Sequence, residues 1–356
     1  MLTWSDIITL RMERQYLAGK AGRGQYDQLY RAMSPVPTRY WTEPGSPPTL
    51  PMHADFDDYT YNHGLRAERK LLKGRFAGGT IGYVQEEDLE VFACLYRKEV
   101  TRYTELQMEI LELLKQEGPM NIGFMKELTK ALAKEITPQL HRLQEAFILY
   151  EDQIDNDHER GWYLLESEFP EIDLDRYSKV EALKKVLPRT AALLIFFDEE
   201  LLKAYYRLPL GLVQNAISEL VEEGSVLPVT LEGRSGYILK QDEDLLKGVA
   251  LPVKGPSVIL LQRNDFLVRA YADILKKSFS SQWDVLNYIL IDGSFHGAVV
   301  GKFKFGPHVI EDVILDLSEE EKAARQEEIV EAVYEEFDRY HSPILRFNGK
   351  ELPYEL

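Results

Sequence analysis

Five basic residues in the first quarter of the chain have the spacing of a surface that contacts phosphates. Arg66, Arg69, Lys70 and Lys73 recur at helical intervals, and Arg75 follows two residues later. A helix over residues 65–73 would place the first four on one face, as in a recognition helix that meets the DNA backbone. We therefore predict DNA contacts by these five residues. The alternative is that they only solvate an exposed helix.

Aromatic side chains precede this cluster in a segment that proline keeps irregular. Residues 34–52 contain six prolines, which exclude a helix interior or a central strand. Loops of this length inside a domain are often functional. Arg39 adds a positive charge there, and Tyr40 and Trp41 are side chains that can stack on an extruded base. We predict that all three contact DNA, the alternative being that Trp41 anchors the loop to the core.

Histidines and carboxylates alternate just before the basic cluster. The set is His53, Asp55, Asp57, Asp58 and His63. Such a set can ligate a divalent metal ion, and a metal-dependent hydrolase is the third function that the sequence leaves open. A polar turn before the basic helix is the interpretation that we favour. We therefore predict no metal site and no cofactor, and we expect the lone Cys94 to be buried and inert.

A repeated pattern indicates how these residues are positioned. Segments 138–165 and 209–239 each contain a helix that runs directly into a strand, a polar turn and a second strand. A helix followed by a two-stranded wing is typical of a winged helix, because neither part can bury its apolar face alone. With an N-terminal unit that ends in a hairpin over residues 74–84, we predict three tandem winged-helix modules: 1–85, 86–170 and 171–250.

The last hundred residues follow a different pattern. Apolar runs over 257–261, 285–292, 296–305 and 308–317 predict strands, and Asp292-Gly293 is a strong hairpin signal. An acidic amphipathic helix follows over 319–340. We predict that residues 251–356 form a C-terminal antiparallel sheet covered by this helix. The fold class is then α+β, mainly helical, with a β-rich cap.

Charge and composition limit the function classes. The chain has 356 residues and a net charge of −17. Residues 11–75 carry 11 basic and 7 acidic side chains, a balance of +4, whereas residues 311–340 carry 3 basic and 12 acidic ones, a balance of −9. DNA contacts are therefore expected in the N-terminal part, and a protein partner for the acidic helix. No apolar run is long enough for a membrane span, and one cysteine fits a reducing compartment, so we predict a cytoplasmic protein.

The order of several segments resembles a known family. They are Arg75–Leu89 (RFAGGTIGYVQEEDL), Gly118–Leu128 (GPMNIGFMKEL), Leu251–Tyr271 (LPVKGPSVILLQRNDFLVRAY) and Tyr288–Gly301 (YILIDGSFHGAVVG). In this order they resemble the tandem winged-helix proteins related to bacterial DNA glycosylases that unhook interstrand crosslinks, the AlkZ/YcaQ-like group. The resemblance spans nearly the whole chain. It implies double-stranded DNA as the partner and hydrolysis of N-glycosidic bonds as the activity.

The catalytic pair of that group has no match at its expected place. The resemblance implies a Gln–hydrophobic–Gln or Gln–hydrophobic–Asp pair after the second N-terminal helix, where it would hold a water and stabilise positive charge on the sugar. Residues 33–38 (MSPVPT) offer Pro35 and Pro37 instead. Gln153-Ile154-Asp155 fits the second pattern but lies in the predicted wing of the second module. Asp55, Asp57 and Asp58 are the remaining candidates for the water-positioning role.

The sequence thus predicts a winged-helix DNA-binding protein that resembles crosslink- and alkylation-repair DNA glycosylases. Whether it is an enzyme is left open by the missing pair. The alternative is a non-catalytic regulator or protein-interaction scaffold built on the same modules.

Overall fold

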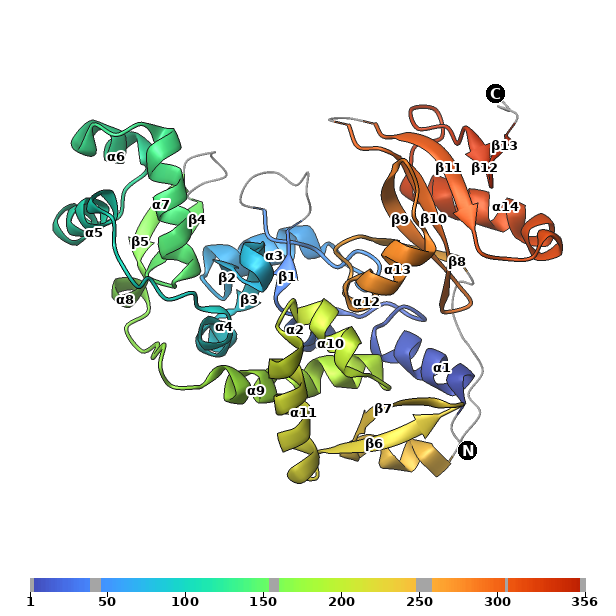
Figure 1. Cartoon of the computed structure of the whole chain (residues 1–356). Helices are drawn as coiled ribbons and strands as arrows, with labels where there is room; N and C mark the ends of the chain where they lie inside the picture. The colour runs from blue at the N-terminus through green and yellow to red at the C-terminus, as the bar shows by residue number, and fades with distance from the viewer. Residues whose placement is uncertain (1–2, 39–45, 154–159, 248–257, 305–306, 353–356) are drawn as a thin grey trace.

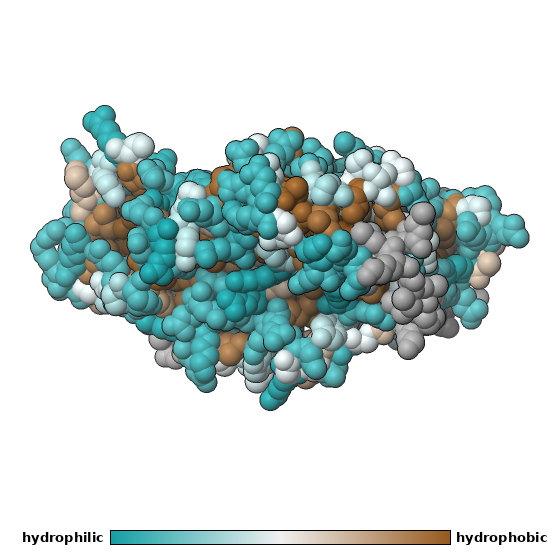
Figure 2. Space-filling model, turned by 90° about the horizontal axis from the view of Figure 1, so that it is seen from below, coloured by the Kyte–Doolittle hydropathy of each residue, from teal (hydrophilic) through white to brown (hydrophobic). Residues whose placement is uncertain are grey.

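The computed structural model describes residues 3–38, 46–153, 160–247, 258–304 and 307–352. Within this part of the chain, no helix is long and apolar enough to cross a bilayer. The elements lie in an elongated arrangement, with helices α5–α7 at one end and the C-terminal sheet at the other (Figure 1). Hydrophilic residues predominate on the face seen from below (Figure 2).

The N-terminal part combines helices with a small three-stranded sheet of order β1-β3-β2. Strand β1 is short and lies at the sheet edge, where proline is tolerated because its missing N–H is not needed for pairing. The elements are α1 (Trp4–Arg14), α2 (Arg23–Ala32), β1 (Val36–Pro37), α3 (Asp58–Ala67), β2 (Leu71–Arg75), β3 (Ile81–Gln85) and α4 (Leu89–Tyr96).

The predicted basic helix over residues 65–73 is wrong. Helix α3 begins earlier, because the Asp57 side chain caps it by accepting from the Thr60 N–H, and it ends at Ala67. Arg69 has a left-handed backbone with φ of 58°, and strand β2 follows. Leu71 and Leu72 are both fully buried as strand residues. Their burial determines the local structure here, and it outweighs the helical spacing of the charges.

The middle of the chain contains the predicted repeat. Helices α7 and α11 each run into a two-stranded antiparallel hairpin, β4-β5 and β6-β7. The elements of the two stretches are α5 (Glu105–Glu117), α6 (Ile122–Thr129), α7 (Ala133–Glu145), β4 (Leu149–Gln153), β5 (Arg160–Leu164) and α8 (Leu165–Glu168), then α9 (Lys179–Leu194), α10 (Glu199–Tyr206), α11 (Leu210–Glu222), β6 (Val226–Leu231) and β7 (Arg234–Leu239).

The C-terminal part is a sheet with an acidic helix, as predicted, but the sheet is not wholly antiparallel, because β11 and β12 pair in parallel. Six strands run in the order β13-β12-β11-β10-β9-β8, and α14 packs against β8 with Ile329 and Val333 buried. A protein partner for this helix stays a prediction. The elements are β8 (Val258–Gln262), α12 (Phe266–Ala270), α13 (Ala272–Ser278), β9 (Asp284–Ile291), β10 (Ser294–Lys302), β11 (Val309–Leu315), α14 (Glu319–Glu336), β12 (Arg346–Phe347) and β13 (Lys350–Glu351).

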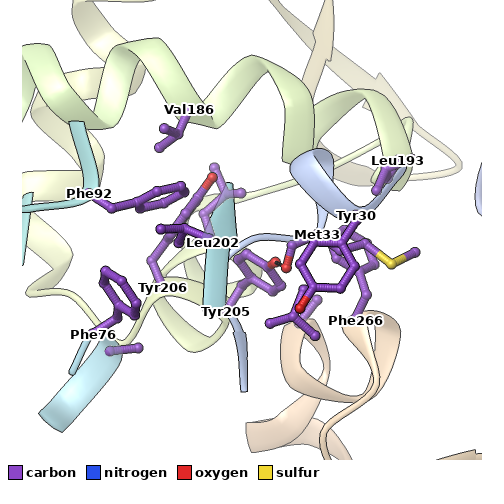
Figure 3. Close-up of a cluster of buried hydrophobic side chains, with 14 of the residues drawn as sticks. Tyr30, Met33, Phe76, Phe92, Val186, Leu193, Leu202, Tyr205, Tyr206 and Phe266 are labelled. Atoms are coloured by element: carbon purple, nitrogen blue, oxygen red, sulfur yellow. Dashed lines mark hydrogen bonds between the residues drawn. The ribbon is translucent and has the colours of Figure 1, made fainter. Parts of the chain in front are cut away.

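One large core joins segments far apart in the sequence. Tyr30 and Met33 come from α2 and its C-terminal end, Tyr205 and Tyr206 from α10, and Phe266 from α12, and Figure 3 shows them gathered beneath α9. Helices α5–α7 and hairpin β4-β5 enclose a separate core around Trp162. The C-terminal sheet and α14 enclose a further core around Ile289, Val299 and Ile329. The mixed α+β class is confirmed.

Candidate nucleic-acid interface

The five basic residues of the predicted DNA surface lie on three different elements. Arg66 is in the last turn of α3, Arg69 and Lys70 are in the following turn, and Lys73 and Arg75 are on β2. They therefore share no helical face, and the predicted helical arrangement is wrong.

Acidic residues of β4 and α8 neutralise much of this cluster. The Arg66 guanidinium lies 3.3 Å from the Asp152 carboxylate. Arg69 pairs with Glu168 and also lies over the rings of Tyr150 and Tyr163. Helix α3 and the turn after it are thus joined to β4 and α8 by ion pairs.

Lys73 forms the most buried of these pairs. Its side chain is 9% exposed, and its Nζ lies 2.7 Å from Oε1 of Glu151, whose side chain is fully buried. Gln144 Nε2 donates to Oε2 of Glu151 at 3.2 Å, and Arg75 Nε donates to Oε1 of Gln144 at 2.9 Å. Burial by itself raises the pKa of Glu151, but Lys73 outweighs it and holds that pKa below its ordinary value. Lys73 therefore has a structural partner and little exposed surface for a phosphate.

Lys70 is the most exposed member of the cluster. Its side chain is 61% exposed, and its Nζ lies 2.6 Å from a carboxylate oxygen of Glu68. Arg39, Tyr40 and Trp41, the other predicted DNA contacts, lie outside the described residues. Their role stays a prediction.

The residues of the alternative metal site make separate contacts in the fold. His53 is buried, with Nδ1 2.6 Å from the Gln15 carbonyl oxygen and Nε2 2.9 Å from a carboxylate oxygen of Asp265. Among the described residues, no three His, Cys, Asp or Glu side chains are grouped so as to hold a metal ion. Within the described part of the chain, His53, Asp55, Asp57, Asp58 and His63 are therefore not brought together as a set of metal ligands.

The three candidate catalytic aspartates have different surroundings. Asp58 is buried and accepts from the Tyr26 hydroxyl at 2.9 Å and from the Leu50 N–H at 2.6 Å. Asp57 caps α3, and Asp55 is exposed. Asp57 and Asp58 thus stabilise the start of α3 and the loop before it. A water-positioning role for any of the three stays a prediction.

His53 links the N-terminal part to the C-terminal part. Burial lowers the pKa of His53, but Asp265 and the Gln15 carbonyl outweigh it and raise that pKa above its ordinary value of 6.5. Both ring nitrogens face acceptors, so the fold favours the doubly protonated, charged ring.

This geometry predicts a pH-dependent stability. Because the folded-state pKa of His53 is raised, the charged ring contributes stability that is fully present below about pH 6.5, and that stability is lost as pH rises through the folded pKa. Asp265→Asn should remove most of this effect while keeping the α12 cap, since Asn caps as well as Asp. Urea unfolding of both proteins from pH 5.5 to 9 should show a stability difference that shrinks with rising pH. A constant difference would contradict a charged His53.

A small pocket, called the central pocket below, lies where the resemblance places the catalytic pair. Pro35 and Pro37 line it from β1 and the residue before it, and Phe76 and Thr80 line it from the turn between β2 and β3. Its volume is about 30 Å³, enough for one or two waters and about tenfold below a typical ligand pocket. None of the three candidate aspartates lines it. Of the Gln153-Ile154-Asp155 motif, only Gln153 is described, and its backbone pairs with Arg160 in the β4-β5 hairpin.

The polar side chains of this pocket come from elements distant in sequence. Arg207 follows α10 and donates to the Thr80 hydroxyl oxygen at 3.0 Å. Asn264 Nδ2 donates to the Thr38 carbonyl oxygen at 2.6 Å. Arg269 donates to the Pro35 carbonyl oxygen at 2.9 Å. Sequence reasoning missed these residues. The only signal was that Asn264 and Arg269 belong to one of the segments that carry the family resemblance.

Comparisons with known proteins found similarity at the level of the fold. No family model matches the chain, and no curated protein does. Among solved structures, the chain is similar to the Streptomyces sahachiroi DNA glycosylase AlkZ, with a TM-score of 0.67 and 15% sequence identity. The match covers 97% of this chain and 98% of that chain. The predicted resemblance to the AlkZ/YcaQ-like group is confirmed for the fold.

Proposed function

We propose that this chain is a double-stranded-DNA-binding protein with the fold of a DNA-repair glycosylase, and that it does not excise bases. The observation that carries the proposal is the near-complete coverage of the AlkZ fold, together with a central pocket lined by arginines and prolines. This combines the predicted DNA binding with the non-catalytic alternative.

We infer three winged-helix modules and a C-terminal cap, with boundaries near residues 85, 170 and 250. In the second and third modules, α7 and α11 precede the hairpins that would serve as wings. In the first, α3 precedes hairpin β2-β3, so α3 takes the place of the helix that enters the groove. Tyr59 and Thr60 are exposed on α3, and His63 is partly exposed. Of the predicted basic residues, Lys70 and Arg69 follow α3 directly and are the ones exposed enough to contact phosphates.

The pocket chemistry supports binding without excision. N-glycosidic cleavage develops positive charge on the sugar, which needs a nearby carboxylate or oriented carbonyl oxygens. No carboxylate belongs to the described lining of this pocket, whereas Arg207 and Arg269 do. At about 5 Å and an effective dielectric constant of about 20, one guanidinium would oppose such a charge by about 3 kcal/mol.

A gel-shift titration tests the binding surface. The wild type should bind a duplex of about 30 base pairs with salt-dependent affinity, and Lys70→Glu should weaken that affinity about tenfold at 50 mM salt, because a phosphate contact becomes a repulsion. Lys350→Glu makes the same charge change in the C-terminal part, where the side chain is also exposed, and should leave binding unchanged. Equal effects of the two substitutions would contradict a local surface around α3.

A further inference from the structure

Arg207 is held at the rim of the central pocket without a carboxylate partner. It lies directly after α10 in a left-handed conformation with φ of 52°, and its side chain is exposed. Its guanidinium donates to Thr80 Oγ1. Its Cδ lies 3.8 Å from where a Cβ on Gly78 would stand, so the glycine leaves room for the arginine to lie along the turn. Among the described residues, no Asp or Glu forms an ion pair with it.

A second arginine lies behind it. The Arg269 guanidinium stacks on the Tyr205 ring at 4.2 Å and donates to the carbonyl oxygens of Pro35 and Tyr205 at 2.9 and 3.4 Å. It too has no carboxylate among its described ion pairs. These contacts fix its position, so its charge adds to that of Arg207 at one place.

The size and charge of the pocket together define what can enter it. A volume of about 30 Å³ suits a small group or water and is about tenfold below that of a typical ligand pocket. Two guanidinium groups and a hydroxyl are suited to an anionic oxygen, since arginine presents several donors to a phosphate. A cationic alkylated base would be repelled.

We propose that this pocket is a phosphate subsite, in which Arg207 binds one backbone phosphate of duplex DNA and Arg269 supports it electrostatically. This proposal rests on the proposed DNA binding and specifies which group the central pocket binds. It places the DNA backbone, and not an extruded base, against β1.

The experiment compares Arg207→Gln with Lys203→Gln. Both remove one positive charge, and Lys203 lies one turn earlier on α10, where it pairs with Glu200 at 2.7 Å. Fluorescence anisotropy with a duplex at 50–300 mM salt should show that Arg207→Gln reduces the slope of log Kd against log salt by about 0.9, the value for one phosphate. Its affinity at 50 mM salt should fall about five- to tenfold. Lys203→Gln should match the wild type, and Arg207→Lys should restore the slope.

A second arm identifies the phosphate itself. The probes are duplexes in which one phosphate at a time is replaced by a neutral methylphosphonate. The wild type should bind more weakly when the replacement is at one particular position. Arg207→Gln should bind that duplex as well as it binds the unmodified one. If the wild type binds the duplex but Arg207→Gln has the same salt slope as the wild type, the phosphate subsite is overturned and the proposed function is not. A wild type that binds no duplex at any salt would instead overturn the proposed function.

Discussion

Replacing Lys73 by methionine is expected to lower the free energy of unfolding by about 3 kcal/mol, because it leaves the Glu151 charge without its main partner inside the protein. Glu151 is completely buried, and its pKa is held below its ordinary value by Lys73 although burial alone raises it. The loss should be near the lower end of the range for broken buried pairs, since Arg160 remains 3.5 Å from Glu151. Urea denaturation at pH 7 measures it.

Two further variants separate this cause from lost packing. In Lys73→Met/Glu151→Gln, both charges are removed, so the double variant should be more stable than Lys73→Met alone. Lys70→Met removes an exposed lysine three residues away and should leave the denaturation midpoint unchanged. If the double variant loses as much free energy of unfolding as Lys73→Met and Glu151→Gln lose together, the ion pair is not the source of the effect.

This pair also explains why the basic cluster was misassigned from the sequence. The charges at 66, 69, 70 and 73 have helical spacing, but Leu71 and Leu72 are adjacent and both buried, which suits a strand at a core. The acidic partners, Glu151, Asp152 and Glu168, lie about eighty or more residues away. Local periodicity gives no information about partners at that separation.

Helix–hairpin repeats were more accessible from the sequence. In segments 138–165 and 209–239, the change from helical to alternating spacing lies within one continuous stretch, and both hairpins are present. The C-terminal sheet was predictable for the same reason, since Asp292-Gly293 forms the β9-β10 turn with both residues at positive φ.

The residues of the central pocket could not have been predicted from local sequence patterns. It is lined by β1, β3 and the β2-β3 turn, by the residue after α10, and by α12 with the segment before it. These elements meet through one common core. Pro35 and Pro37 were recognised as a departure from the family pattern. Arg207 belongs to no local motif, and the family-like segment that contains Asn264 does not show what Asn264 contacts. The tertiary structure brings both residues to the pocket.

Base excision from crosslinked and N7-alkylated duplexes is expected to be at least about 10⁴-fold slower than with AlkZ as the comparator. A missing oriented polar group costs about 10²–10³ in rate, and repulsion by a guanidinium in the pocket adds about 10². Single-turnover assays at protein concentrations that saturate the duplex measure the chemical step separately from binding. The comparator must excise under the same conditions for the result to count.

Excision within tenfold of the comparator would contradict a binding-only protein and would require a group that holds the water. Asn264 is the carboxamide in the described lining of the pocket, and Asp55, Asp57 and Asp58 are the carboxylates predicted from the sequence. Asn264→Ala, Asp55→Asn, Asp57→Asn and Asp58→Asn would then identify which group acts, through a loss of rate at unchanged DNA affinity. Asp58→Asn needs a parallel unfolding measurement, since Asp58 accepts two hydrogen bonds in the core.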